Sequence, residues 1–210
     1  MRLDLVDLDL PLPGFRRFIG AWVLRRDGQT IVVDPGPRAT ALKLVAALAA
    51  LGVSRVDRIL LTHVHLDHGG GAAELLVACP GARLHVPAPG REHLLDPGKL
   101  WEGTLATLGP VAEAYGQPGP VPARLLGDDA ELAACGIQVI PTPGHAPHHV
   151  AYRVDDVLFA GEAITTALTL PDGRLYHRPA TPPRFVPEVY LASMDRLAAV
   201  DPEPAVTALG

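Results

Sequence analysis

One short segment, Thr62–Gly71 (THVHLDHGGG), constrains this chain more than any other. It holds four side chains that can ligate a transition metal: His63, His65, Asp67 and His68. The apolar run Val56–Leu61 comes directly before it and predicts a buried strand, and the run Ala72–Ala78 after it predicts a helix. The potential ligands therefore lie where a buried strand ends and a helix begins, a position where open α/β sheets bind their ligands.

The spacing of these residues favours a shared pocket. Side chains two residues apart on an extended segment point to the same side, so His63, His65 and Asp67 can face one site. His68 faces elsewhere unless the chain turns, and the glycines that follow it make a turn easy. Imidazole and carboxylate groups suit zinc, iron or manganese without selecting one. Four such residues exceed what one tetrahedral ion takes from a short loop, so we expect two neighbouring ions.

The pattern HxHxDH after an apolar strand resembles the metallo-β-lactamase superfamily, whose hydrolase fold is shared by glyoxalase II-like thioesterases, lactonases and metal-dependent nucleases. Three further segments resemble family motifs in the family's order: Ile31–Gly36 (IVVDPG), Thr142–Tyr152 (TPGHAPHHVAY) and Leu158–Ala163 (LFAGEA). The resemblance implies an α/β (α+β) fold class with four αββα layers, in which two mixed sheets are sandwiched between helices.

The resemblance also implies a ligand set. His63, His65 and His145 would hold the first metal ion, and Asp67, His68 and Glu162 would hold the second. Asp34 would lie behind the ligands as a structural carboxylate. Three histidines and one open position lower the pKa of a metal-bound water to about 7. We expect two divalent ions, with zinc first and iron or manganese as alternatives.

The chain departs from the family pattern at three points. Glu162 stands where the family has aspartate, and its extra methylene carries the oxygens about 1 Å further. The carboxylate then either ligates with altered geometry or points away and leaves a weak second site. His148 replaces the usual glycine and would narrow the pocket or face solvent. No histidine follows His177, although the family places a last ligand after a final strand such as Pro204–Leu209. We therefore expect one domain over residues 1–210, truncated just before that ligand.

Residues that contact substrate are harder to assign. The proline-rich segment Arg174–Phe185 (RLYHRPATPPRF) predicts an ordered loop, because prolines exclude a helix. Five residues are candidates for substrate contact: His148, His149, His177, Arg178 and Arg184. The arginines would suit a carboxylate or phosphate, and stacking on prolines at the surface explains them equally well. The resemblance gives His149 a role in structure or in substrate contact. His93 fits a solvated helix position better than a place in the pocket.

Composition narrows the functional class. With 210 residues and 48% apolar content, the chain can form one globular domain. A net charge of −5 gives no reason to expect a nucleic-acid partner. No apolar run approaches membrane-spanning length, and Asp4, Asp7 and Asp9 interrupt any signal peptide. Isolated Cys79 and Cys135 suit a reducing cytoplasm. We expect a cytoplasmic protein with a small-molecule substrate, and a homodimer stays open.

The main functional hypothesis is a metal-dependent hydrolase of the glyoxalase II-like type. A hydroxide on the metals would attack an ester, thioester or lactone carbonyl, and Asp67 would orient it or pass a proton to the leaving group. Thioesters rank first because of the resemblance. One alternative is a redox enzyme with a single iron at His63, His65 and His145, similar to the superfamily's persulfide dioxygenases. Another is a non-catalytic, metal-stabilised binding domain, which the departures at Glu162 and at the chain end favour.

The remaining elements follow from periodicity and turn signals. Asp27-Gly28 predicts a type I′ hairpin between two apolar runs. Other expected elements are an edge strand near Leu3–Leu8, helices over Ala39–Leu51 and Glu188–Ala199, and a hairpin of Val150–Val154 with Val157–Phe159. Pro97 and Pro110 should break the helices between Glu92 and Tyr115.

Overall fold

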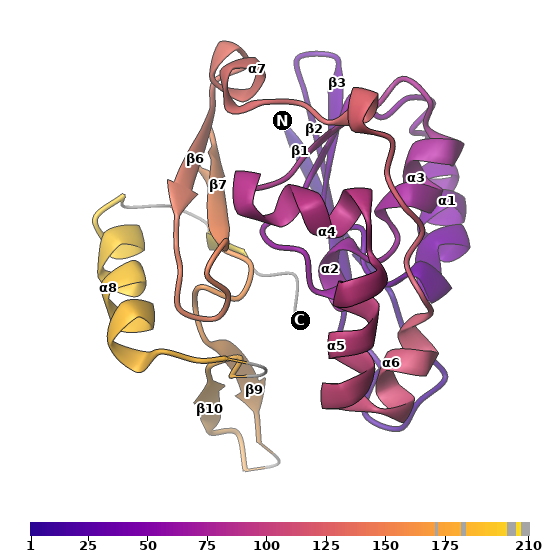
Figure 1. Ribbon diagram of the computed structural model, residues 1–210. Helices are drawn as coiled ribbons and strands as arrows, with labels where there is room; N and C mark the ends of the chain where they lie inside the picture. The colour runs from indigo at the N-terminus through magenta and orange to yellow at the C-terminus, as the bar shows by residue number, and fades with distance from the viewer. Residues whose placement is uncertain (171, 182–183, 201–204, 207–210) are drawn as a thin grey trace.

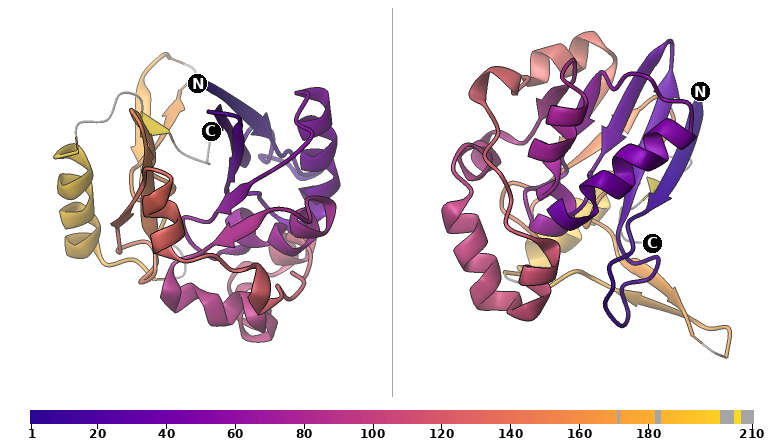
Figure 2. Two further views of the ribbon diagram at one scale, coloured as in Figure 1. Left: turned by 90° about the horizontal axis from the view of Figure 1, so that it is seen from above. Right: turned by 90° about the vertical axis from the view of Figure 1, so that its right-hand side faces the viewer.

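Two sheets lie face to face in the molecule, and helices cover the outer face of each (Figure 1). This computed structural model describes residues 1–170, 172–181, 184–200 and 205–206. Seen from above in Figure 2, helices α1 (Ala41–Ala50) and α8 (Pro187–Ala198) lie on opposite sides of the paired sheets. The four-layer αββα arrangement expected from the sequence is confirmed.

The first sheet has five strands in the order β1-β2-β3-β4-β5. They are β1 (Arg2–Asp7), β2 (Gly20–Arg26), β3 (Gln29–Val33), β4 (Arg58–Leu60) and β5 (Arg83–His85). The β2–β3 turn has φ values of 49° at Asp27 and 75° at Gly28, as a type I′ turn requires. Strands β3, β4 and β5 are parallel because α1 and α3 (Ala72–Ala78) carry the chain back between them. The carboxyl ends of β3 and β4 therefore meet at one edge.

The second sheet contains β6 (Ile137–Pro141), β7 (Val150–Val154), β8 (Val157–Phe159) and β11 (Ala205–Val206), in the order β11-β8-β7-β6. The expected β7–β8 hairpin is present, and Asp155 in its turn has a φ of 53°. The short helix α7 (Asp129–Ala134) precedes β6, and the Asp128 carboxylate caps it by accepting from the Glu131 N–H. The final strand expected over Pro204–Leu209 is described only at its two residues in β11.

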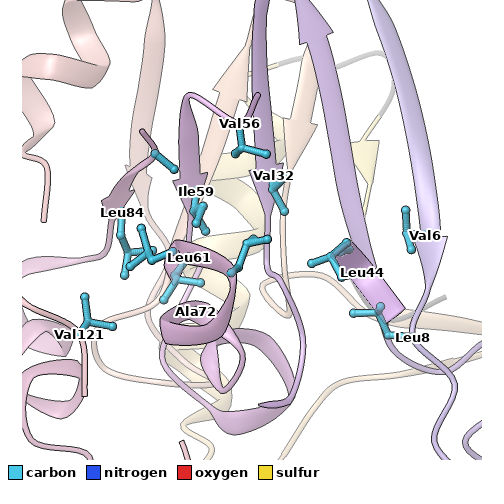
Figure 3. Packing of buried hydrophobic residues seen from close by; sticks show 14 of the residues in the cluster. Val6, Leu8, Val32, Leu44, Val56, Ile59, Leu61, Ala72, Leu84 and Val121 are labelled. Atoms are coloured by element: carbon cyan, nitrogen blue, oxygen red, sulfur yellow. The ribbon is translucent and has the colours of Figure 1, made fainter. Parts of the chain in front are cut away.

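Three apolar cores join the four layers. Ile31 and Leu60 face the second sheet, where they pack with Tyr152 and Phe159. Their chain neighbours Val32 and Ile59 face the opposite way, into the core beneath α1 and α3 (Figure 3). The third core joins β6–β8 to α8 through Leu197. The strict alternation of side chains along β3 and β4 is what allows both faces of the sheet to be buried.

A helical insert connects β5 to β6. It contains α4 (Arg91–Leu95), α5 (Gly98–Leu108) and α6 (Pro110–Tyr115), and it breaks at Pro97 and Pro110 as expected. Single-turn 3₁₀ helices occur at Arg38–Thr40, Ala88–Gly90 and Ala123–Leu125. The insert continues from the edge of the first sheet where β4 and β5 end, so it lies close to the potential ligands. Among the described residues, no helix is both long and apolar enough to cross a membrane.

The segment Arg174–Phe185 differs from its expected loop. Strand β10 (Leu175–Arg178) pairs antiparallel with β9 (Thr166–Thr169) in a separate two-stranded sheet. The prolines of this segment all follow Arg178, so the residues before them keep the N–H groups that a ladder needs. The chain turns between β9 and β10 at Gly173, whose φ is 83°.

Candidate metal centre

The loop after β4 carries the ligand-type residues into one site. His63 and His65 lie on its extended part, and the short helix α2 (Leu66–Gly69) carries Asp67 and His68. This helical turn is what brings His68 round to the same site as its neighbours. Gly70 follows α2, and a Cβ there would lie 2.4 Å from the Leu66 carbonyl oxygen. Only glycine therefore fits this close approach of the backbone.

Three histidines and a glutamate converge. One ligand atom from each of His63, His65, His145 and Glu162 can be chosen so that all four lie within 4.8 Å of one another. His145 Nε2 lies 3.2 Å from His63 Nε2 and 2.9 Å from His65 Nδ1. Nitrogens bound to a tetrahedral zinc ion are about 3.3 Å apart, given zinc–nitrogen bonds of about 2.0–2.1 Å. The spacing and the donor types therefore fit a divalent metal ion.

Glu162 points into this cluster. Its Oε2 lies 2.7 Å from His145 Nε2, 3.2 Å from His63 Nε2 and 3.4 Å from His68 Nε2. The carboxylate thus lies between the three-histidine group and His68. Gly161 holds the backbone close, with a φ of 53° and no room for a Cβ beside Thr62. The backbone that precedes Glu162 therefore lies tight against the ligand loop.

Asp67 and His68 border the four-residue cluster rather than joining it. His68 Nε2 lies 3.8 Å from Asp67 Oδ2 and makes no hydrogen bond within the described part of the chain, although it is fully buried. A buried nitrogen without a hydrogen-bond partner is costly unless something binds it. Among the described residues, the ligand atoms that lie close enough together to hold an ion are those of His63, His65, His145 and Glu162, and Asp67 and His68 lie beside this cluster.

Asp34 fixes the ligand loop from behind. It is 1% exposed and lies just beyond β3 with a φ of 51°. Its Oδ1 accepts from the Thr62 N–H at 2.8 Å, and its Oδ2 lies 2.8 Å from the Thr62 hydroxyl and 3.0 Å from His68 Nδ1. When the His68 Nδ1–H donates a hydrogen bond to this carboxylate, the lone pair on Nε2 is directed at the site. From this position Asp34 holds both the backbone of Thr62 and the ring of His68.

Two more contacts orient ligands. His149 is buried, accepts from the Glu162 N–H at Nε2 (3.1 Å), and lies 2.8 Å from the Thr142 hydroxyl at Nδ1. Both ring nitrogens are thus occupied inside the protein, which favours the structural role over substrate contact. His145 Nδ1 lies 3.0 Å from the Ala180 carbonyl, which orients the ring so that Nε2 faces the cluster.

Burial and charge set the protonation of the centre. Burial lowers the pKa of His65 to about 3 and that of His63 well below its usual value, so both rings are neutral and can ligate. Burial alone would raise the pKa of Glu162, but the rings of His145, His63 and His68, whose Nε2 atoms lie 2.7 Å, 3.2 Å and 3.4 Å from its Oε2, outweigh burial and lower that pKa. Burial also opposes protonation of His68, yet the nearby Asp34 and Asp67 carboxylates raise its pKa above the usual value. The centre therefore consists of imidazole rings around the negatively charged carboxylate of Glu162.

The centre opens into a cavity of about 610 Å³. Its floor includes His65, Asp67, His145 and Glu162, and its walls come from α5, α6, the Phe15–Phe18 region and the end of β10. Of the substrate candidates, only Arg178 lines it. His177 is exposed and lies 3.1 Å from the Thr165 hydroxyl, and Arg184 is exposed and absent from the lining.

The expectations for His148 and His93 need correction. His148 is half-buried and does not line the cavity; its Nε2 accepts from the Val64 N–H at 3.2 Å, and burial lowers its pKa to about 4. His93 lines the cavity together with Lys99, contrary to the solvated position expected for it. The places of His93 and Lys99 could have been expected from the topology, because the helical insert that carries them starts at the same sheet edge as the ligand loop.

Comparison with known proteins agrees with this geometry. Residues 15–208 match the family model described as the metallo-beta-lactamase superfamily. The hydroxyacylglutathione hydrolase of Aeromonas hydrophila is 32% identical over 85% of this chain and 56% of its own length. That of Albidiferax ferrireducens is 33% identical over 91% of this chain and 61% of its own length. The chain thus spans less than two thirds of the length of these curated relatives.

Solved structures show the same fold. An archaeal metallo-beta-lactamase superfamily protein from Sulfolobus tokodaii superposes with a TM-score of 0.79 at 25% identity, covering 99% of this chain and 79% of that one. A metallo-beta-lactamase family protein from Thermus thermophilus gives a TM-score of 0.66 at 25% identity, covering 98% and 72%. With its sequence match over most of the chain, its sandwich of two sheets and its histidine-rich centre, this protein belongs to the metallo-beta-lactamase superfamily.

Proposed function

We propose that this chain is a metal-dependent hydrolase of an ester, thioester or lactone, with thioesters as the first choice. The observation that carries the proposal is the convergence of His63, His65, His145 and Glu162 at the base of an open cavity. A centre that lies at the floor of a cavity gives a substrate access to the ligands, whereas a purely structural site is closed.

The ligands divide into two proposed sets. His63, His65 and His145 would hold one divalent ion, Asp67 and His68 the other, and Glu162 would contact both. Zinc is the first choice of ion. Bound here, such ions supply Lewis acidity, which eases loss of a proton from water and stabilises negative charge on a carbonyl oxygen.

Asp67 is the proposed acid–base residue. It lines the cavity, and its side chain is 20% exposed, whereas the other carboxylate of the centre, Glu162, is 7% exposed. A carboxylate that lines the cavity can orient the attacking water and return a proton to the leaving thiol, and we assign this role to Asp67.

The comparisons support the choice of reaction class. Both curated relatives carry the name hydroxyacylglutathione hydrolase, and such an enzyme cleaves a thioester. Because this chain spans only part of their length, its own leaving group stays a proposal. A small-molecule substrate in the cytoplasm fits this function.

The first test is the metal content of purified protein, measured by elemental analysis, together with thioester hydrolysis. We expect two divalent ions per chain and measurable turnover. His63→Ala should lose at least one ion and reduce turnover by about 10³-fold or more, because it removes a ligand that nothing nearby replaces. His177→Ala is the matched control, since this exposed histidine does not line the cavity.

The alternatives give different outcomes. A single iron ion and oxygen uptake with a persulfide substrate would replace the hydrolase by the redox hypothesis. Protein without metal and without turnover would favour a binding domain. Full turnover in His63→Ala would refute the assignment of the centre.

A further inference from the structure

The cavity beside the metal centre has one distinctly apolar wall. Five residues from the N-terminal region and the helical insert form it: Phe15, Phe18, Leu100, Leu108 and Val111. All five are half-buried, and all pack from one side against the main core. Their other side faces the cavity, so this apolar surface is left uncovered by the protein itself. We name these five residues the apolar wall.

Polar groups on the same side of the cavity offer a ligand few free hydrogen-bond donors. Thr104 and Thr107 line the cavity, but their hydroxyls donate to the carbonyls of Leu100 and Gly103 at 2.8 Å each. Their donor capacity is therefore used within α5. The cavity's cationic side chains, Lys99 and Arg178, are exposed. A bound group that lies along α5 thus meets hydrocarbon, and it meets charge only where it reaches solvent.

Helix α5 has apolar side chains that the protein covers only in part. None of its residues is fully buried, although it carries Leu100, Trp101, Leu105 and Leu108. A helix with an apolar stripe is normally stabilised by covering that stripe. Pockets of 300–1,000 Å³ that are mostly apolar with a few placed polar groups are typical of small-molecule sites, and this cavity has that size and character.

We propose that the substrate carries an apolar group of several carbons next to the scissile carbonyl, and that this group binds against the apolar wall. This inference rests on the proposed hydrolase function and names the substrate class for the same site. The class is thioesters with an alkyl or aryl group, rather than small polar hydroxyacyl compounds.

Two substrate series test the inference. In the first, the acyl group runs from acetyl through butanoyl and hexanoyl to octanoyl on one small neutral thiol. In the second, an acetyl group is carried by thiols of increasing alkyl length. Each methylene that binds against the wall should raise kcat/KM by about twofold to fourfold, until the cavity is filled.

The outcomes separate this inference from the proposed function. A rise along either series supports it. Turnover that is flat or falling along both series overturns it while leaving the hydrolase function intact. No turnover of any thioester, with metal bound, is instead a failure of the proposed function.

Variants of α5 locate the apolar group. Leu108→Ala removes part of the wall and should reduce the gain from acetyl to octanoyl by about 5- to 30-fold. Leu105→Ala is the matched control, because Leu105 is a half-buried leucine of the same helix that does not line the cavity. It should leave the gain unchanged. Equal effects of the two variants would show that the gain comes from helix packing rather than from contact with the wall.

A binding measurement gives a readout without turnover. Octanoate should displace an apolar fluorescent anion, anilinonaphthalene sulfonate, from wild type and from Leu105→Ala. Displacement from Leu108→Ala should need about 5- to 30-fold more octanoate. Displacement at equal concentrations in all three proteins would overturn the placement of the group at this wall.

Discussion

The two sides of the cavity are built in opposite ways. In the metal centre at the floor, His63, His68 and Glu162 are buried, and hydrogen bonds to Asp34 and His149 hold the ring of His68 and the backbone of Glu162 in place. On the walls, the residues of α5 and β10 are half-buried or exposed. A ligand group must be held to a fraction of an ångström to serve a metal ion, whereas an apolar wall needs only area. The floor therefore decides the chemistry, and the walls decide which substrate is accepted.

The largest effect should come from Asp34, which supports the floor. Asp34→Asn keeps the shape of the side chain but removes the charge that faces His68. We expect metal affinity to fall by about 10- to 100-fold and the free energy of unfolding to fall by about 3 kcal/mol. Metal titration and chemical denaturation measure the two effects.

Asp27→Asn is the control for this change. Asp27 has a similar positive φ of 49° but lies exposed in the β2–β3 turn. It should alter neither metal affinity nor stability by a comparable amount. If both variants behave alike, the contribution of Asp34 is local backbone conformation and not support of the centre.

Gly161 should give the next largest effect. A Cβ in Gly161→Ala would lie 2.7 Å from the Thr62 hydroxyl and 2.8 Å from His149 Nε2, so the backbone that carries Glu162 must move. We expect a loss of about 2–3 kcal/mol in unfolding free energy, together with weaker metal binding. Gly173→Ala also has a positive φ but meets open space, and it should cost about 1 kcal/mol with normal metal binding. Normal metal binding in Gly161→Ala would show that Gly161 is not needed to position Glu162.

The smallest effect concerns His85, a buried histidine away from the centre. Neither of its ring nitrogens has a hydrogen-bond partner in the described chain, and burial lowers its pKa from 6.5 to about 4. The unfolded chain thus binds a proton at His85 more readily than the folded chain does. The stability that depends on neutral His85 is full above pH 6.5 and is lost as the pH falls towards 4.

His85→Leu should therefore flatten the acid side of the stability profile. We expect the variant to lose about 2 kcal/mol less than wild type between neutral pH and pH 4, as measured by urea denaturation at each pH. Parallel profiles for the two proteins would show that His85 is protonated equally in both states. Such a result would place the acid sensitivity in other groups, such as His148 and the histidines of the centre.

Local elements of this fold could be predicted from the sequence because their signals are local. The Asp27-Gly28 turn, the helix over Ala72–Ala78 and the breaks at Pro97 and Pro110 follow from backbone preferences of neighbouring residues. The β9–β10 pairing did not follow, because the partners of a ladder are set by distant chain segments. The prolines after Arg178 also concealed it.

The same division applies to the site. The sequence by itself determined the ligand types, because a run of histidines and an aspartate after a buried strand has few other uses. Only the tertiary structure decided that Glu162 points inward, that both nitrogens of His149 are already occupied, and that His93 rather than His177 lines the cavity. The physical reason is that the chemistry of a side chain is set by its residue type, whereas its direction and its accessibility depend on the packing of segments far apart in the chain.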